Sequence, residues 1–344
     1  MNQSIWGDQE TQFFYQLHPE TILQAVETLG LTCTGRCMAL NSMENRVFEI
    51  EIESDSPHPS DHFLIAKFYR PGRWNKEQIL EEHEFIFDLN REEIPAIAPK
   101  IFDGQSLFQM KDQNLYFCVF PRQGGRAPQD LSSENLENLG RLLARMHNVG
   151  ASKPAPHRLA ITPTSFGRNN AKTLAENRVI APHVEASYMR VVEEICELSQ
   201  PLFEDLTTHR IHGDCHWGNI LHRPDQGMYF IDFDDMLIGP AIQDLWLVVP
   251  GTDIESVQDR SIMIEAYQTM RDFDHRELAL IEPLRALRFI HFSAWISKRW
   301  QDPAFQRAFP QFSEPNYWEI QLQDLLKQKA LIEQRNTDMF SAGF

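Results

Sequence analysis

Cysteine is scarce in this 344-residue chain, and long apolar runs are missing from it. The five cysteines are odd in number and form no CxxC pair, so we expect reduced thiols rather than a disulfide framework. No uncharged apolar stretch reaches the roughly 18 residues of a membrane span. The first residues, Met1 to Asp8, carry no basic segment followed by an apolar one, which argues against a signal peptide. We therefore expect a cytoplasmic protein that binds no membrane.

Positive charge is also in short supply. The chain has 32 Lys and Arg against 49 Asp and Glu, which gives a formal net charge of −17. Such a surface repels phosphate backbones and anionic lipids, so we expect no general nucleic-acid binding. A local basic pocket for one anionic ligand remains compatible with this balance. The length suits two lobes of ~100–200 residues each.

Apolar spacing over the first third of the chain predicts a mixture of helices and strands. Helical spacing occurs at residues 20–29 and again at residues 76–89. Strand-like runs, either alternating or continuously apolar, occupy residues 46–52, 63–69 and 115–120.

Beyond this region the spacing is mainly helical. Residues 121–128 contain two glycines and two prolines and are expected to form a hinge. A Pro-rich loop is expected at 151–167, and a short β-like stretch at 210–235. Helical spacing covers residues 132–147, 184–198, 257–273, 277–300 and 317–335. We therefore expect an α+β protein with a small mixed α/β N-terminal lobe, residues 1–120, the hinge, and a larger, mainly helical C-terminal lobe, residues 129–344.

The stretch most informative about function begins at Arg210 with the sequence RIHGDCHWGNIL and continues at 228–235 with MYFIDFDD. It predicts a polar loop and two short strands joined by a turn at 224–227, followed by a cluster of carboxylates. Such a frame can aim Asp214, Asn219 and Asp232 at one point. One Asp can accept the proton of an attacking hydroxyl, while the Asn and the second Asp hold Mg²⁺ against phosphates. The pattern therefore favours phosphoryl transfer.

Two other interpretations of this stretch stay open. The His-Gly-Asp turn can be a structural loop with a capping carboxylate. Alternatively, His212, Cys215, His216 and His222 could bind a metal, although no distant His or Asp ligands stand at a recognisable spacing.

The two motifs resemble those of the aminoglycoside phosphotransferase and choline kinase branch, H-G-D-x-H-x-x-N and D-x-[DE]. The residues from His212 to Asn219 and from Asp232 to Asp234 match position by position. A kinase also needs a strand lysine for the phosphates and a helix glutamate to orient it. Lys67 lies in an apolar strand. The next helix offers three acids as its partner, Glu81, Glu82 and Glu84, and the family's spacing to Leu89 favours Glu82. A lysine of an edge strand that faces water is the alternative interpretation.

The loop expected to cover the phosphates departs from the protein-kinase form, because the chain has no G-x-G-x-x-G. Residues 40–48 instead resemble the E-N-x-V-[YF] loop of the same branch. Ser42, Glu44 and Asn45 suit a turn whose backbone N–H groups and hydroxyl can meet phosphate oxygens. A plain hairpin turn is the alternative. Further along, residues 239–245 resemble the family's G-P-x-x-x-D-L pattern, and this resemblance implies that Asp244 anchors the Asp214 loop from a helix start.

Several longer stretches extend the resemblance over nearly the whole chain. They include residues 38–47, 67–74, 78–83, 281–286 and 299–305. Together they resemble the bacterial stress response kinase A family. The resemblance implies a protein-kinase-like, bilobal fold and a cytoplasmic, monomeric Ser/Thr protein kinase of the stress response that uses ATP and Mg²⁺.

The resemblance also implies roles for single residues. It makes Asp214 and Asp232 catalytic, and Asn219 and Asp232 metal ligands. It places Ser42, Asn45, Lys67 and Glu82 in the ATP site. The acceptor is either a protein or a small molecule, so a kinase for an alcohol or amine is the first alternative function. A nucleotide-binding regulator without turnover is the second.

Overall fold

The computed structural model describes residues 14, 17–110, 114–128, 132–223 and 226–342. It divides into two compact units. The first unit comprises Met1–Leu131 and His216–Met236, and the second comprises Ser132–Cys215 and Leu237–Phe344. The expectation about the N-terminal leader concerns residues outside the described part. The expected hinge at 121–128 stays a prediction.

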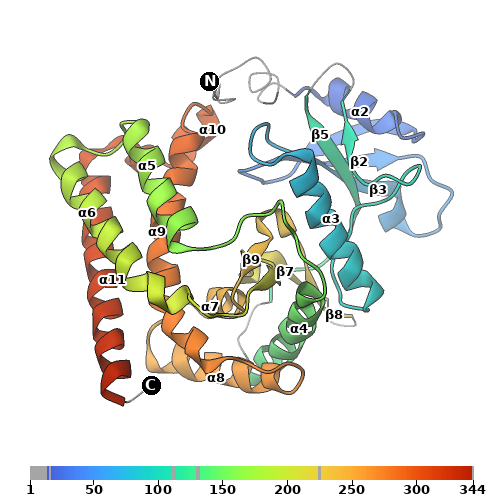
Figure 1. Ribbon diagram of the computed structural model, residues 1–344. Helices are drawn as coiled ribbons and strands as arrows, with labels where there is room; N and C mark the ends of the chain where they lie inside the picture. The colour runs from blue at the N-terminus through green and yellow to red at the C-terminus, as the bar shows by residue number, and fades with distance from the viewer. Residues whose placement is uncertain (1–13, 15–16, 111–113, 129–131, 224–225, 343–344) are drawn as a thin grey trace. The chain divides into compact units, whose positions relative to one another are not determined.

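An antiparallel five-stranded sheet is the core of the first unit (Figure 1). Its strands follow the order β1-β2-β3-β5-β4. They are β1 Cys33–Ala39, β2 Arg46–Ile52, β3 Phe63–Phe68, β4 Phe108–Gln109 and β5 Tyr116–Pro121. The strands expected at 46–52, 63–69 and 115–120 are confirmed to within one residue. The sequence did not predict β1, because it contains a glycine and is mostly exposed, so it has no clear apolar alternation.

Two helices cover this sheet, and the core clusters place them on different faces. Helix α2, Pro19–Glu27, packs Ile22 and Val26 against Phe68 of β3 in the larger apolar cluster. Helix α3, Lys76–Arg91, contributes Ile79 to a second cluster with Tyr69 and Cys118. Asn75 caps α3 in a complete capping box with Gln78, which explains where this helix begins.

The first unit also contains a short hairpin that follows the His-Gly-Asp motif. Its parts are η4 Trp217–Asn219, β7 Ile220–Arg223, β8 Gly227–Phe230 and η5 Phe233–Asp235. Phe230 exchanges backbone hydrogen bonds with the segment after α3: its N–H donates to Pro95 and its carbonyl accepts from Ile97. These long-range bonds hold residues 216–236 in the first unit, whereas the sequence had placed them in the C-terminal lobe. Residues 224–225 of the expected turn lie outside the described residues.

The second unit is mainly helical (Figure 1). Its long helices α6, α9 and α11 share one apolar core, in which Tyr188 and Trp318 pack edge to face with ring centroids 5.6 Å apart. A two-stranded sheet pairs β6 with β9. The elements are α4 Ser133–Ala151, η2 Pro163–Arg168, α5 Asn169–Glu176, α6 Pro182–Ser199, η3 Gln200–Phe203, β6 His209–Ile211, β9 Leu237–Gly239, α7 Ile242–Val248, α8 Ile254–Gln268, η6 His275–Leu280, α9 Ile281–Lys298, α10 Pro303–Ala308, η7 Pro310–Ser313 and α11 Pro315–Ala342.

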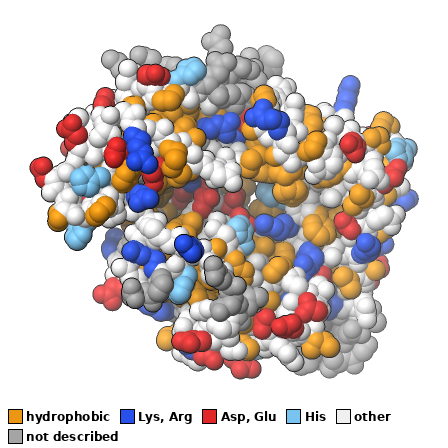
Figure 2. Space-filling model, turned by 180° about the vertical axis from the view of Figure 1, so that it is seen from behind, with side chains coloured by type: hydrophobic (Ala, Val, Ile, Leu, Met, Phe, Trp, Pro, Cys, Tyr) orange, Lys and Arg blue, Asp and Glu red, His pale blue; other side chains and the backbone are white. Residues whose placement is uncertain are grey.

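The expected helices of this unit are present, with ends shifted by a few residues. The expected loop at 151–167 differs at its end, where Pro163 opens a π-helical turn. Thr162 and Ser165 stabilise that turn with reciprocal capping hydrogen bonds. Among the described residues, no helix is both long enough and apolar enough to cross a membrane. Acidic, basic and hydrophobic side chains are interspersed over the face shown in Figure 2.

Candidate functional site: a buried lysine cluster and an anchored aspartate loop

Lys67 is the centre of a buried ionic cluster in the first unit. It lies on β3, points away from the apolar cluster under α2, and is 5% exposed. Its Nζ lies 3.4 Å from Glu82 Oε1 of α3, 3.0 Å from Asp234 Oδ1 and 3.5 Å from Asp232 Oδ1. The structure thus brings together three of the residues that the sequence singled out, Lys67, Glu82 and Asp232, and adds Asp234.

The carboxylates keep this buried lysine charged. Burial alone would lower the pKa of Lys67, but the nearby carboxylates of Asp234, Glu82 and Asp232 raise it well above its usual value. Lys67 is therefore a permanent cation in a poorly solvated position, where its attraction for an anionic ligand is stronger than in water.

Glu82 contacts Lys67 because of where it falls on α3. It is buried, whereas Glu81 is half-buried and Glu84 is exposed. Of the three acids that the sequence offered, Glu82 is the one whose carboxylate reaches Nζ of the lysine.

Asp232 and Asp234 belong to one motif but have different surroundings. The side chain of Asp232 is 56% exposed, whereas that of Asp234 is 4% exposed and lies between Lys67 and Arg73. Asp232 has a left-handed backbone, with φ 59° and ψ 64°, a conformation that Asp tolerates better than most residues. This turn separates the directions of the two carboxylates, so that Asp232 remains accessible to an ion.

Asn219 and Asp232 lie at the same end of the hairpin. The backbone N–H of Ile231 donates to the carbonyl of Asn219 at 3.0 Å, and Ile220 pairs with Phe230. The register therefore places the Asn beside the residue that precedes Asp232. An amide oxygen and one accessible carboxylate fit Mg²⁺, which takes few protein ligands, prefers oxygen and keeps water or phosphate in its other positions.

The alternative set of metal ligands does not form. Within the described parts of the chain, no three His, Cys, Asp or Glu side chains come together as a metal site. The Nδ1 atom of His216 instead accepts a hydrogen bond from the N–H of Gly218 at 3.0 Å and caps the turn before Asn219.

The loop between β1 and β2 carries the expected phosphate-binding residues. Asn45 is buried, and its Oδ1 accepts a hydrogen bond from the N–H of Arg70 at 3.1 Å. This side chain fixes the loop to the end of β3. Ser42 is half-buried on the same loop.

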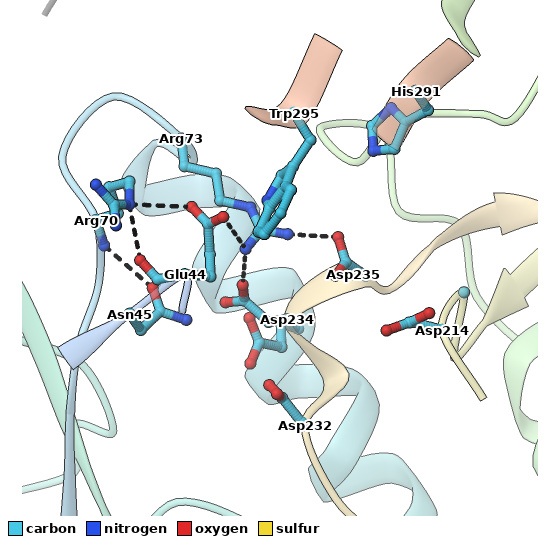
Figure 3. A network of polar contacts seen from close by, with 12 residues as sticks. Glu44, Asn45, Arg70, Arg73, Asp214, Asp232, Asp234, Asp235, His291 and Trp295 are labelled. Carbon is cyan, nitrogen blue, oxygen red and sulfur yellow. Dashed lines mark hydrogen bonds and ion pairs between the residues drawn. The ribbon is translucent and has the colours of Figure 1, made fainter. Parts of the chain in front are cut away.

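Arg73 is the residue of this cluster that sequence reasoning missed. Its guanidinium contacts the carboxylates of Glu44, Asp234 and Asp235 (Figure 3). Arg73 belongs to the stretch 67–74 that carries the family resemblance, but no role was predicted for it from the sequence.

In the second unit, Asp244 holds the loop that carries Asp214. Its Oδ2 accepts from the N–H of His212 at 2.8 Å, and its Oδ1 accepts from the N–H of Gly213 at 2.9 Å. His147 lies with Nε2 3.1 Å from the same carboxylate, and all these groups are buried. The expected anchoring role of Asp244 is confirmed.

Asp214 itself is partly exposed and is paired. Arg288 of α9 donates from Nη2 to Asp214 Oδ1 at 2.9 Å. The preceding Gly213 has φ 85°, which a side chain would strain, so this sharp turn depends on glycine. The local pattern gave no hint of the Arg288 contact, because the two residues are 74 positions apart.

The amino-acid sequence is similar to a known protein family and to named proteins. A sequence model of a family described as "Phosphotransferase enzyme family" matches residues 38–281. "Stress response kinase A" of Escherichia coli (strain K12) is 38% identical over 322 residues, which cover 93% of this chain and 95% of that protein. "Serine/threonine protein kinase RdoA" of Salmonella typhimurium (strain LT2) is 35% identical over 93% of this chain and 95% of its own length.

Solved structures show the same fold at lower identity. Amicoumacin kinase, in complex with AMP-PNP, Ca²⁺ and its ligand, has a TM-score of 0.68 at 19% identity and covers 87% of this chain and 93% of its own. Choline kinase LicA from Streptococcus pneumoniae has a TM-score of 0.61 at 15% identity and covers 90% of this chain and 100% of its own. The expected α+β, protein-kinase-like fold is thereby confirmed.

Proposed function

Because this chain belongs to the phosphotransferase enzyme family, we propose that it is a kinase that transfers the terminal phosphoryl group of ATP to a Ser or Thr hydroxyl of a protein. The observation that carries the proposal is the Lys67 cluster. A buried lysine, held by a helix glutamate and facing an accessible aspartate, is the arrangement that kinases use to bind phosphates and their metal.

Lys67 would bind phosphate oxygens of ATP, and Glu82 would hold its ammonium in place. Asn219 and Asp232 would hold Mg²⁺, which supplies charge neutralisation to the phosphate oxygens when it is bound. Ser42 and the backbone N–H groups of its loop would meet the remaining phosphate oxygens, and Asn45 would keep that loop in shape through Arg70.

Asp214 would act as the general base. It would accept the proton of the acceptor hydroxyl at a carboxylate oxygen, and Arg288, which donates to its Oδ1, would hold the carboxylate in a fixed orientation. Asp244 would keep the loop rigid, since it bonds two successive backbone N–H groups ahead of the base.

The choice of a protein acceptor is supported by the curated relatives, one of which is named a serine/threonine protein kinase. The solved structures support a second candidate, a small-molecule kinase, because they include an amicoumacin kinase, a choline kinase and a spectinomycin phosphotransferase. A nucleotide-binding regulator without turnover fits less well, since the set Lys67, Asp214, Asn219 and Asp232 is complete. A role in the stress response, a cytoplasmic location and a monomeric state remain predictions.

Incubation with γ-labelled ATP and Mg²⁺ tests the proposal. One arm contains a general protein substrate and the other a pool of small alcohols and amines. We expect label on protein Ser or Thr with the wild type and none with Asp214→Asn. Asp324→Asn is the matched control, because Asp324 lies on α11 and pairs with Lys327 at 3.4 Å. Label in the small-molecule arm alone would favour the second candidate, and no ADP in either arm would overturn the assignment.

A further inference from the structure

Arg73 is a buried cation that joins two segments of the first unit. Its side chain is 9% exposed. Nη1 contacts Asp234 and lies 3.5 Å from Glu44 Oε2, while Nη2 contacts Asp235. Glu44 belongs to the loop before β2, whereas the two aspartates follow β8. One guanidinium therefore connects the expected phosphate loop to the segment with the expected metal ligand (Figure 3).

Arg70 completes this connection from the other side of the Pro71-Gly72 turn. Its Nε donates to the carbonyl of Glu44 at 2.8 Å, and its Nη2 donates to the carbonyl of Met43 at 3.1 Å. Nε also lies 3.4 Å from Glu44 Oε1. The two oxygens of the Glu44 carboxylate are thus shared between the two arginines, so the loop is fixed both by its backbone and by its side chain.

The charges of the cluster show what Arg73 adds to the two buried cations, Lys67 and Arg70. Five carboxylates, those of Glu44, Glu82, Asp232, Asp234 and Asp235, meet three cations, Lys67, Arg70 and Arg73. Burial by itself would lower the pKa of Arg73, but Asp234, Asp235 and Glu44 raise it well above its usual value, so the guanidinium stays charged. The formal charge of the cluster is 3 − 5 = −2 with Arg73 and would be 2 − 5 = −3 without it, so the loss of Arg73 would increase the repulsion of a polyphosphate.

Asp234 is the carboxylate that the loss of Arg73 would affect most. It contacts both Lys67 and Arg73. If Arg73 were lost, this buried carboxylate would lose part of its compensating positive charge, which is costly inside a protein. Its ion pair with Lys67 would then supply more of the compensation, and Lys67 would be less available to a ligand.

We propose that Arg73 is a positioning residue that sets affinity for the phosphate chain of the nucleotide. It holds the Glu44 loop to the Asp234-Asp235 segment and leaves Lys67 available for phosphate. This inference rests on the proposed function, since it presupposes that ATP binds at Lys67. It predicts that the contribution of Arg73 grows with the number of phosphate charges on the ligand.

The test is calorimetric titration of the full chain with ATP, ADP and AMP in the presence of Mg²⁺. We expect Arg73→Gln to weaken ATP binding by at least about tenfold, as truncation of a buried charge pair does, ADP binding by less, and AMP binding little. Arg91→Gln is the matched control, because Arg91 is also in the first unit but is 64% exposed and pairs with one carboxylate, Asp88. The control should bind all three nucleotides like the wild type.

Two further variants separate positioning from a loss of folding. Arg73→Gln combined with Asp235→Asn removes one negative charge together with the positive one, and we expect it to bind ATP more tightly than Arg73→Gln alone. Arg73→Lys keeps a charge in the cluster but lacks the planar fork that reaches three carboxylates. Arg73→Lys replaces the glutamine variant if that variant does not fold. We again expect the affinity for ATP to fall more than the affinity for AMP.

The outcomes that overturn the inference are distinct from those that overturn the proposed function. Equal losses for ATP, ADP and AMP would make Arg73 a purely structural residue. Wild-type affinities in both Arg73 variants would remove it from the site altogether. If the wild type transfers label from ATP to protein Ser or Thr in either case, the proposed function stands and only the inference fails. If the wild type binds no nucleotide, both fail.

Discussion

The ammonium of Lys67 lies 3.4 Å from the carboxylate of Glu82, and this pair joins β3 to α3 inside the first unit. The two side chains are almost fully buried and 15 positions apart. The strand faces the lysine away from the apolar cluster under α2, and the helix turns the glutamate toward it. The pair therefore depends on the packing of α3 on the sheet as well as on the two residues.

We expect Glu82→Gln to lower kcat/KM for ATP by up to about 100-fold, because a misplacement of a reacting or binding group by ~1 Å has that effect. Lys67→Met should lower kcat/KM for ATP by about 10²–10³-fold, since it removes a charge that would contact the phosphates directly. Steady-state ADP formation measures both. Glu84→Gln is the control, because Glu84 is exposed on the same helix. Equal activity in Glu82→Gln and Glu84→Gln would contradict the assigned pair.

The contact between Arg288 and Asp214 gives a second prediction. Arg288→Gln removes an ion pair in which the arginine is 43% exposed, and solvent screening limits such a pair to about 0.2–1 kcal/mol. We expect kcat to fall by up to about fivefold, with KM for ATP unchanged, because Arg288 acts on the base and not on the nucleotide. Arg288→Lys should recover part of the rate. Arg168→Gln, which breaks an exposed pair with Glu193 in the same unit, should leave kcat unchanged. A higher KM for ATP at normal kcat would argue against this role.

Asp244 gives a prediction about stability as well as rate. Its two oxygens accept from the N–H groups of His212 and Gly213, and an asparagine would have one acceptor oxygen for the same two donors. We expect Asp244→Asn to lower the free energy of unfolding by about 1–3 kcal/mol, the cost of a buried group left unsatisfied. Urea unfolding measures this change, and kcat should fall in parallel. A variant as stable and active as the wild type would show that the loop does not depend on this anchor.

Glu277 predicts a pH dependence of stability. Burial raises its pKa to about 7, although its carboxylate accepts a hydrogen bond from the N–H of Ile242, which acts in the opposite direction. In the unfolded chain the group ionises near 4.5, whereas in the folded protein it stays protonated until about pH 7. Between these two pH values the unfolded state therefore binds fewer protons than the folded state. The contribution of Glu277 to the free energy of unfolding falls as pH rises through this window, by at most about 3 kcal/mol.

Glu277→Gln should flatten this slope between about pH 4.5 and pH 7. Urea unfolding at a series of pH values measures the difference from the wild type. A slope that is the same in both proteins would show that Glu277 is not held protonated in the fold.

Short-range patterns predicted much of the fold and of the site. Strands β2 and β3 follow from alternation and from continuous apolar runs, and helix α3 follows from its apolar spacing. Lys67 was conspicuous because it interrupts an apolar strand, whereas Glu82 was favoured over its neighbouring acids by the family's spacing to Leu89. Features encoded within about ten residues of one another were therefore visible in the sequence.

Long-range pairings were not visible. Arg73 contacts Asp234 from 161 positions away, and Arg288 contacts Asp214 from 74 positions away. Residues 216–236 belong to the first unit because Phe230 bonds to the backbone near Pro95, which no local pattern can indicate. Each of these contacts depends on how separate elements pack. The sequence does not distinguish an arginine that faces solvent from one that pairs with carboxylates inside the fold.

The most direct test of the central claim is ADP formation from ATP and Mg²⁺ by the wild type and by Asp214→Asn, with ATP affinity measured on the same samples. The account predicts that the variant binds ATP as tightly as the wild type but turns it over about 10²–10⁴-fold more slowly, because only the general base is lost. Wild-type turnover in Asp214→Asn would contradict phosphoryl transfer through this residue.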